Sequence, residues 1–338
     1  MEEVTTGIYR LPVPLPNSPL GHVNAYLIQA DKGYLIVDTG WDTDEAFNSL
    51  RRQMAEIGAR PEEISQIVIT HIHPDHYGLA GRLKPLSQAR INMHRLERDY
   101  VRSRYVNMEK LLQHMAEWLA VNGVPPDELP SLQIASTPAA RFVIPTSPDN
   151  TLNGGETIRA GSFNFKVLWT PGHSPGHISL YEPARKILIS GDHILPGITP
   201  NIARHPQSGP NPLHDYLSAL DAVKQLDVEL VLPGHEHPFD NLTARIDQLV
   251  RHHQQRNSEI LNTLKDQPKT GYQIATELTW MPDTKASNWQ NLAPLNRRFA
   301  VLETLSHLEF MRFQGRLDKS TRDNVIYYQL PDTHQRAK

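Results

Sequence analysis

The six residues 71–76, His-Ile-His-Pro-Asp-His, restrict what this chain can become more than any other segment. They follow an apolar, β-branched run that predicts a buried strand. Side chains two apart in an extended segment face the same side, so His71 and His73 can reach one ion together. The proline ends the strand, and the turn after it can point Asp75 and His76 at a second position. Four ligand-type side chains in so short a run have no use in packing, and together they predict a metal site.

Three more times, an apolar run that predicts a strand stops at a turn carrying histidine or aspartate. His173 lies in Thr-Pro-Gly-His, Asp192 in Ser-Gly-Asp-His and His235 in Pro-Gly-His. Strand ends are common places for chemistry, because the sheet is rigid and the loops are accessible. Taken singly, each could be an ordinary turn residue, but beside the first run we interpret all three as metal ligands. We interpret His177 as structural and leave His237 open between a structural and a substrate-facing role.

Two ligand sets follow from these residues. Neutral imidazole and carboxylate suit zinc, with iron or manganese as alternatives. Three protein ligands and a shared carboxylate leave each ion a place for water, which catalytic sites need and structural sites lack. The expected chemistry is attack of a metal-bridging hydroxide on a carbonyl or phosphoryl centre. The first set is His71, His73 and His173; the second is Asp75, His76 and His235; Asp192 bridges them.

The composition narrows the class of protein and suggests two domains. The 338 residues include no cysteine, which excludes disulfides and thiolate ligands, and no run approaches the roughly 20 apolar residues of a membrane span. The acidic N-terminus has no apolar signal core, so we expect a cytoplasmic protein without a membrane partner. Residues 1–240 carry a net charge of −7 and residues 241–338 a net charge of +4, which supports a boundary near 240. That excess is too small to indicate nucleic-acid binding by itself.

The order of the motifs resembles the metallo-β-lactamase superfamily over about residues 1–240. The resemblance implies an α+β fold, a four-layered αββα sandwich with a dinuclear site at one edge of its sheets. It also implies that Asp38 orients the turn carrying His71 and His73. The matching segments are 24–28, 37–40, 71–76, 170–177, 191–192 and 234–235. Strands are predicted at 7–13, 22–29, 34–38, 64–70, 163–169, 177–181, 186–190 and 229–232, and a helix at 213–226.

Within the superfamily, the residues are similar to those of the glyoxalase II and thioesterase-like branch. True β-lactamases usually lack the bridging aspartate or use cysteine, so Asp192 argues against β-lactam hydrolysis. His237 stands where glyoxalase II-type proteins commonly place tyrosine, which argues against a glutathione thioester. A helical insertion is expected at about 96–130. The segment 241–338 resembles a winged-helix-like domain, with helices predicted at 242–267, 271–278 and 291–314, a charged turn at 316–324 and a strand at 325–330.

These features favour hydrolysis of a small ester, thioester or lactone, with Asp75, Asp192 and Tyr77 as catalytic residues. Tyr77 could donate a hydrogen bond to an oxyanion or be a buried ring. The alternative is an endoribonuclease or phosphodiesterase that holds nucleic acid with its winged helix, although the mixed charge there disfavours it. A regulator that merely kept the metal site is a third hypothesis. The insertion could cover an acyl group, pack on the domain or contact a second copy, so a homodimer stays open.

Overall fold

The computed structural model describes residues 1–280 and 288–331. Two compact units divide the chain, and each draws on separate stretches of sequence. The first unit comprises Met1–Met108, Ala139–Pro200 and Ser218–Ile246, and the second comprises Glu109–Pro138, Asn201–Leu217 and Asp247–Lys338. Much of the expected insertion therefore belongs to the second unit. The assignment of 1–240 and 241–338 as domains stays a prediction.

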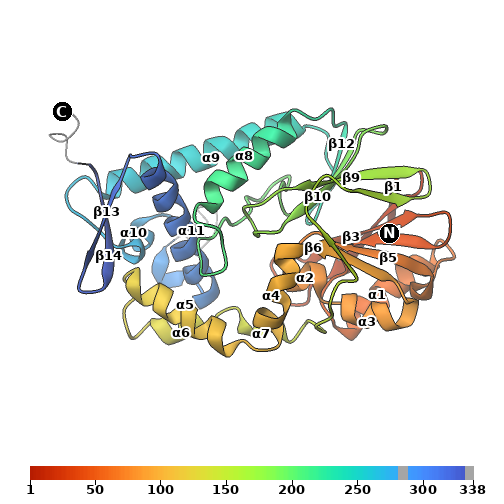
Figure 1. The fold of residues 1–338 in the computed structure, drawn as a ribbon, viewed down its shortest axis with the longest axis horizontal. Helices are drawn as coiled ribbons and strands as arrows, with labels where there is room; N and C mark the ends of the chain where they lie inside the picture. The colour runs from red at the N-terminus through yellow and green to blue at the C-terminus, as the bar shows by residue number, and fades with distance from the viewer. Residues whose placement is uncertain (281–287, 332–338) are drawn as a thin grey trace. The chain divides into compact units, whose positions relative to one another are not determined.

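The first unit contains two sheets, and several of their strands are labelled in Figure 1. The larger is a seven-stranded sheet in the order β1-β2-β3-β4-β5-β6-β7, antiparallel from β1 to β4 and parallel from β4 to β7. The smaller is a five-stranded sheet in the order β12-β11-β10-β9-β8. The strands are β1 (Glu2–Thr5), β2 (Ile8–Pro14), β3 (His22–Gln29), β4 (Tyr34–Val37), β5 (Ile64–Ile69), β6 (Arg90–His94), β7 (Asn150–Leu152), β8 (Thr157–Ala160), β9 (Phe163–Trp169), β10 (Ile178–Glu182), β11 (Ile187–Gly191) and β12 (Leu230–Pro233).

The two faces of the large sheet are buried against different partners. On β3, Val23, Ala25 and Leu27 join a cluster that includes residues of helix α1, whereas Tyr26 and Ile28 pack with residues of the small sheet such as Phe165. The alternation follows from the two-residue period of a strand. A strand that is apolar on both faces must lie between layers, so the two sheets pack face to face with helices outside. This is the expected α+β architecture.

Helices and short turns connect the strands of the first unit or extend from it. Their bounds are α1 (Asp44–Ala55), η1 (Pro61–Glu63), α2 (Pro74–Tyr77), α3 (Ala80–Ser87), α4 (Arg95–Tyr105), α7 (Thr137–Ala140), α8 (Pro212–Lys224) and α9 (Leu242–Thr263). Helices α7, α8 and α9 each run across a boundary between the two units. No helix in the described part of the chain is both long enough and apolar enough to cross a membrane.

The second unit is mainly helical and ends in a hairpin. Its further elements are α5 (Glu109–Val121), α6 (Leu129–Gln133), α10 (Gly271–Glu277), η2 (Trp289–Asn291), α11 (Pro294–Phe313), β13 (Asp318–Arg322) and β14 (Val325–Gln329). Its core joins Met115 and Leu119 of α5 to Leu305 and Leu308 of α11 and to Tyr328 of β14. Helices α9, α10 and α11, followed by the pair β13 and β14, fit the expected layout, while the winged-helix classification stays a prediction.

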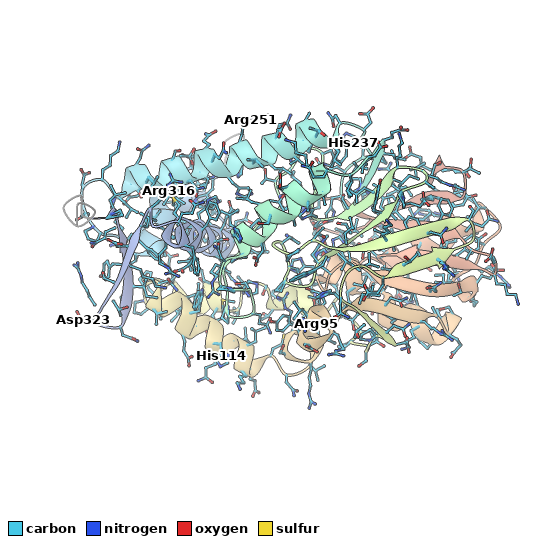
Figure 2. The ribbon with its side chains drawn as sticks, turned by 45° about the horizontal axis from the view of Figure 1, so that its top comes forward. Arg95, His114, His237, Arg251, Arg316 and Asp323 are labelled. Atoms are coloured by element: carbon cyan, nitrogen blue, oxygen red, sulfur yellow. The ribbon has the colours of Figure 1, made fainter. Side chains whose placement is uncertain are left out.

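The hairpin corrects one expectation from the sequence. Residues 316–324 were expected to form a charged turn, yet they contain strand β13, which pairs antiparallel with β14. Most side chains of β13 are exposed, so the strand carries no apolar alternation that could reveal it. Asp323, at the hairpin tip in Figure 2, and Asn324 both have positive φ values, 49° and 62°. Those backbone angles are typical of a tight two-residue turn.

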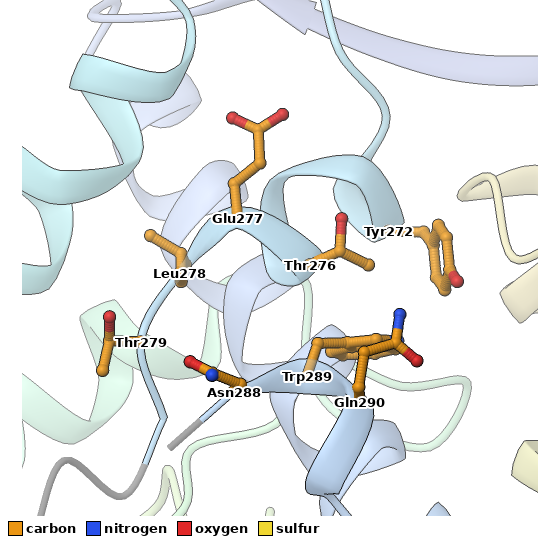
Figure 3. Close-up of a pocket in the computed structure, with 8 residues that line it drawn as sticks. All are labelled: Tyr272, Thr276, Glu277, Leu278, Thr279, Asn288, Trp289 and Gln290. Atoms are coloured by element: carbon orange, nitrogen blue, oxygen red, sulfur yellow. The ribbon is translucent and has the colours of Figure 1, made fainter.

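A cavity of about 660 Å³ opens within the second unit (Figure 3). Its described lining carries aromatic, hydroxyl, amide and carboxylate groups and none of the residues predicted to bind metal. The lining residues are Tyr272, Thr276, Glu277, Leu278, Thr279, Asn288, Trp289 and Gln290. The predicted ligands all belong to the residue ranges of the first unit.

Candidate metal centre

The seven predicted ligands come together in the first unit, at the ends of strands from both sheets. Strand β5 leads into His71 and His73, and the short helix α2 supplies Asp75 and His76. His173 follows β9, Asp192 follows β11 and His235 follows β12. The side chains fall into groups whose ligand atoms all lie within 4.8 Å of one another. The groups are His71, His73 and His173; His71, His76 and Asp192; and Asp75, His76 and His235.

The first set consists of three ring nitrogens that face one point. Nδ1 of His73 lies 2.9 Å from Nε2 of His71 and 3.0 Å from Nε2 of His173. In a tetrahedral zinc site with metal–nitrogen bonds of about 2.1 Å, ligand nitrogens are about 3.4 Å apart. A single proton on Nδ1 of His73 could satisfy only one of its neighbours. The arrangement suits a cation shared by all three rings.

The second set surrounds a carboxylate oxygen that also faces the first. Oδ2 of Asp75 lies 3.3 Å from Nε2 of His235 and 3.8 Å from Nε2 of His76. Oδ2 of Asp192 lies 3.4 Å from His76 and 3.5 Å from His235. The same oxygen lies 3.6 Å from Nε2 of His173, in the first set. Asp192 therefore occupies the position between the two sets that the sequence predicted for a bridge.

Hydrogen bonds to the far side of three rings select the tautomer that a ligand needs. Nδ1 of His76 lies 2.8 Å from Asp38 Oδ2, and Nδ1 of His235 lies 2.9 Å from the carbonyl oxygen of His22. Nδ1 of His71 lies 3.1 Å from the hydroxyl of Thr70. A carboxylate and a carbonyl can only accept, so Nδ1 of His76 and of His235 carries a proton and Nε2 is the nitrogen left to face a metal.

Three buried polar atoms of this cluster lack a hydrogen-bond partner among the described residues. They are Nε2 of His76, Nε2 of His235 and Oδ1 of Asp192. A buried polar atom without a partner costs about 1–3 kcal/mol, so such atoms rarely gather without a reason. Ligand-type atoms that face one another without hydrogen-bond partners are compatible with a bound cation. The residues present thus fit a pair of divalent metal ions.

The protonation of the cluster divides between the two sets. Burial lowers the pKa of His71 and His73 well below the usual value, and neighbouring imidazoles add to this effect. Burial also lowers the pKa of His76 and His235, but the negative charge of Asp192 and its neighbouring carboxylates outweighs this effect. The pKa of His76 is raised well above normal, and that of His235 is raised to about 10. Carboxylates next to the second set therefore favour positive charge there, which a bound cation would supply.

Asp38 contacts a different part of the centre from the one that was expected. Its Oδ1 accepts the backbone N–H of Thr70 at 2.8 Å, and its Oδ2 accepts the Thr70 hydroxyl at 2.8 Å as well as His76. Asp38 thus orients His76 directly and reaches His71 only through Thr70. No contact joins it to His73 in the described structure. Its own φ is +59°, a conformation that few non-glycine residues adopt.

His177 is not free to bind metal. Its Nε2 accepts the backbone N–H of Asp192 at 3.1 Å, so its Nδ1 carries the proton and donates to the Thr170 hydroxyl at 2.8 Å. Gly191 makes this approach possible, because an added Cβ there would lie 2.7 Å from the ring nitrogen. The ring supports Asp192, in agreement with the structural interpretation of this histidine. His237, by contrast, is exposed (Figure 2).

Tyr77 does not make the contact expected of a catalytic residue. Its ring is fully buried, and its hydroxyl donates to the carbonyl of Thr146 and accepts the Thr146 N–H at 2.7 Å. Burial raises the pKa of Tyr77 to about 12. Both hydrogen-bonding functions of the hydroxyl are thereby used by the backbone. The buried-ring alternative explains these contacts, and we drop the oxyanion role from the site.

Comparison with known proteins places this geometry in a family. Residues 18–235 match the family described as the metallo-beta-lactamase superfamily. The chain belongs to this superfamily. The match ends at the last predicted ligand, His235, and includes the other six. Membership supports a metal-dependent hydrolase, since proteins of the superfamily typically bind divalent metals at such His and Asp clusters.

Several individual proteins resemble the chain along its whole length or a large part of it. It is 25% identical over 328 residues to the probable metallo-hydrolase YqjP of Bacillus subtilis, covering 96% of this chain and 98% of the relative. It is 28% identical over 228 residues to the acyl-coenzyme A thioesterase MBLAC2 of Homo sapiens, covering 64% and 74%. The crystal structure of the superfamily protein TTHA1429 from Thermus thermophilus superimposes with a TM-score of 0.82 at 30% identity, covering 97% and 100%.

Proposed function

We propose that this superfamily member is a dinuclear metal-dependent hydrolase of a small ester, thioester or lactone, with zinc as the first metal to test. The position of Asp192 carries the proposal. Its Oδ2 lies within 3.6 Å of ring nitrogens from both ligand sets, while its Oδ1 has no hydrogen-bond partner among the described residues. A carboxylate in that position can offset the charge of two cations at once, which a neutral histidine cannot do.

Each residue then has a stated role in holding the ions. His71, His73 and His173 would hold one ion, and Asp75, His76 and His235 the other, with Asp192 shared. When bound, the two ions supply a water activated at neutral pH and polarise the carbonyl of the substrate. Asp38, Thr70 and the carbonyl of His22 keep the ring lone pairs directed inward. Burial of His71 and His76 keeps bulk water away from those contacts.

Thioesters are the first substrates that we would test for this hydrolase. The human relative at 28% identity bears the name acyl-coenzyme A thioesterase, and the alignment covers 64% of this chain. That name describes the relative alone, and at this identity it supports a class of bond better than a particular acyl group. The absence of cysteine and the presence of Asp192 argue against β-lactam hydrolysis.

The nucleic-acid alternative finds little support among the charges of the second unit. Four of the basic residues between positions 297 and 322 that could contact phosphate are bound to other groups of the protein. Arg312 and Lys319 both contact the carboxylate of Glu309, at 2.8 and 2.9 Å. Arg297 pairs with Glu128 at 3.4 Å, and Arg298 donates to the hydroxyl of Ser136 at 3.0 Å. Phosphate binding would have to compete with these contacts.

Metal analysis and hydrolysis assays of the purified full chain test the proposal. We expect about two ions per chain and chelator-sensitive hydrolysis of at least one of an acyl-coenzyme A, an aryl ester and a lactone. Asp192→Asn should abolish both the second ion and the activity. Asp227→Asn, an exposed carboxylate that pairs with Lys186, is the matched control. Cleavage of single-stranded RNA alone would favour the nuclease, and fewer than about one ion per chain would refute the metal site.

A further inference from the structure

Glu97 is a buried carboxylate that touches two of the loops carrying predicted ligands. It lies in the first turn of α4 and is fully buried. Its Oε2 accepts the backbone N–H of Ile72 at 3.0 Å, between His71 and His73. Its Oε1 accepts the hydroxyl of Ser174, the residue after His173, and the N–H of Gly176 at 2.6 Å. One side chain therefore connects the loops that supply all three rings of the first set.

The loop at Gly176 packs closely against Glu97. A Cβ added to Gly176 would lie 2.8 Å from Cγ of Glu97 and 2.7 Å from Nδ1 of His94, so only glycine lets the loop approach this closely. Three donors among the described residues face the carboxylate, a pattern that suits a hydrogen-bond acceptor. A packing residue would not need two oxygens directed at two different loops.

Helix α4 also holds the other polar group of the Ile72 residue. The carbonyl oxygen of Ile72 accepts the hydroxyl of Tyr105, at the last residue of α4. Both backbone functions of Ile72 are thus bound by side chains of one helix. The residue lies between two predicted ligands, so a shift of α4 would move both rings.

We propose that Glu97 is a positioning residue that braces the His71/His73 segment against the His173 loop and thereby sets the affinity of the first ion. The inference rests on the proposed metal function. It extends that proposal by assigning control of the affinity of one ion to a residue that is not a ligand of either ion. The second set has direct supports of its own, since Asp38 contacts His76 and the carbonyl of His22 contacts His235. Loss of Glu97 should consequently act on one ion far more than on the other.

Glu97→Gln tests the brace with little change in size. A glutamine amide offers one accepting oxygen and one donating NH₂ group, so a donor must face either Ile72 or the Ser174 and Gly176 pair. We expect the affinity of the first ion for zinc to fall about 10- to 100-fold, as for other outer partners of ligands. Competition with a chromophoric chelator measures the affinity of both ions. The variants His173→Ala and His235→Ala, which each remove a ligand of one set, assign the two affinities to the first and the second ion. Asp99→Asn, an exposed carboxylate on the same helix, is the control and should change neither affinity.

Amide hydrogen exchange of the metal-free chain provides a readout that needs no metal. The amides of Ile72 and Gly176 should exchange faster in Glu97→Gln than in wild type, while that of Thr70, bound to Asp38, should be unchanged. Equal loss of both ions, or unchanged affinity of the first, would overturn the proposal. If the wild-type chain bound no zinc, both the proposed metal function and the proposed control of the first ion's affinity would fail. If amide exchange were unchanged in Glu97→Gln, the proposal that Glu97 holds the two loops together would be rejected.

Discussion

The backbone N–H of Asp192 donates to Nε2 of His177 across 3.1 Å, and no other partner of that N–H is seen in the described structure. The contact holds the one carboxylate that both ligand sets share. Gly191, the residue before Asp192, has a φ of +51°, a conformation that favours glycine. The shape of this turn therefore depends on Gly191 as well as on the contact with the His177 ring. Support of this kind is needed where a carboxylate must keep one orientation toward two sites.

Removal of the His177 ring should weaken the centre without removing a ligand. In His177→Ala, the Asp192 N–H is left buried without a partner, which costs about 1–3 kcal/mol of stability. Metal affinity should fall about 10- to 100-fold, as measured by chelator competition. His177→Gln, whose amide oxygen can accept the same N–H, should recover part of the loss. His237→Ala, at an exposed histidine, serves as the control; equal affinity in all these variants would contradict the support role.

The role of Tyr77 can be decided by removing a single oxygen. Tyr77→Phe leaves the N–H and carbonyl of Thr146 without their partner, so we expect a loss of about 1–3 kcal/mol in the free energy of unfolding. The kcat of the loaded enzyme should stay within about threefold of wild type, because the hydroxyl is already bound to the backbone. Urea unfolding and steady-state assays measure the two quantities. A large fall in kcat at unchanged stability would restore the catalytic interpretation.

Zinc binding should release protons at pH 7.5. Burial lowers the pKa of His235, but Asp192 and Asp75 outweigh it and raise the pKa to about 10; the pKa of His76 is also raised well above normal. Both rings must lose a proton to bind metal, so we expect about two protons released per loaded chain. Titration calorimetry in two buffers of different ionisation enthalpy measures this number. Release of no protons would contradict the charge assignment.

The same pKa shift predicts the pH dependence of the metal-free fold. The folded pKa of His235, about 10, lies above its unfolded value of about 6.5. Its proton therefore stabilises the fold fully below about pH 6.5, and this contribution is lost as the pH rises through about 10. Thermal melting of the metal-free chain between pH 7 and pH 10 should show the decline, reduced in His235→Asn. His214→Ala, at an exposed histidine, is the control and should keep the slope.

Sequence patterns predicted the strands of the core more accurately than the rest. The expected ranges 22–29 and 163–169 coincide with β3 and β9, because each strand is long and has at least one face that is buried over most of its length. The exposed strand β13 was missed, since it owes its conformation to pairing with β14. The helical insertion expected at about 96–130 contains two helices, α4 and α5, with a break at 106–108.

The ligand types could be predicted from short spacing, whereas two of their supports could not. His71 and His73 are two apart, and this local pattern carries the chemistry by itself. The carbonyl of His22 is a backbone group, which no residue type can signal, and it meets His235 across 213 positions. Glu97 was hidden in the expected insertion, where a glutamate in the first turn of a helix is ordinary. Such contacts depend on the tertiary fold rather than on neighbouring residues.

The second unit is built from three separate segments of the chain, and this limits where the protein can be truncated. Met115, Leu119 and Leu132 belong to Glu109–Pro138, yet they share a core with residues such as Ile260 and Leu305 that come much later in the chain. A truncation at residue 240 would leave those three side chains exposed to water and would favour aggregation. During synthesis, too, these early helices must wait for the last quarter of the polypeptide before their apolar faces are covered.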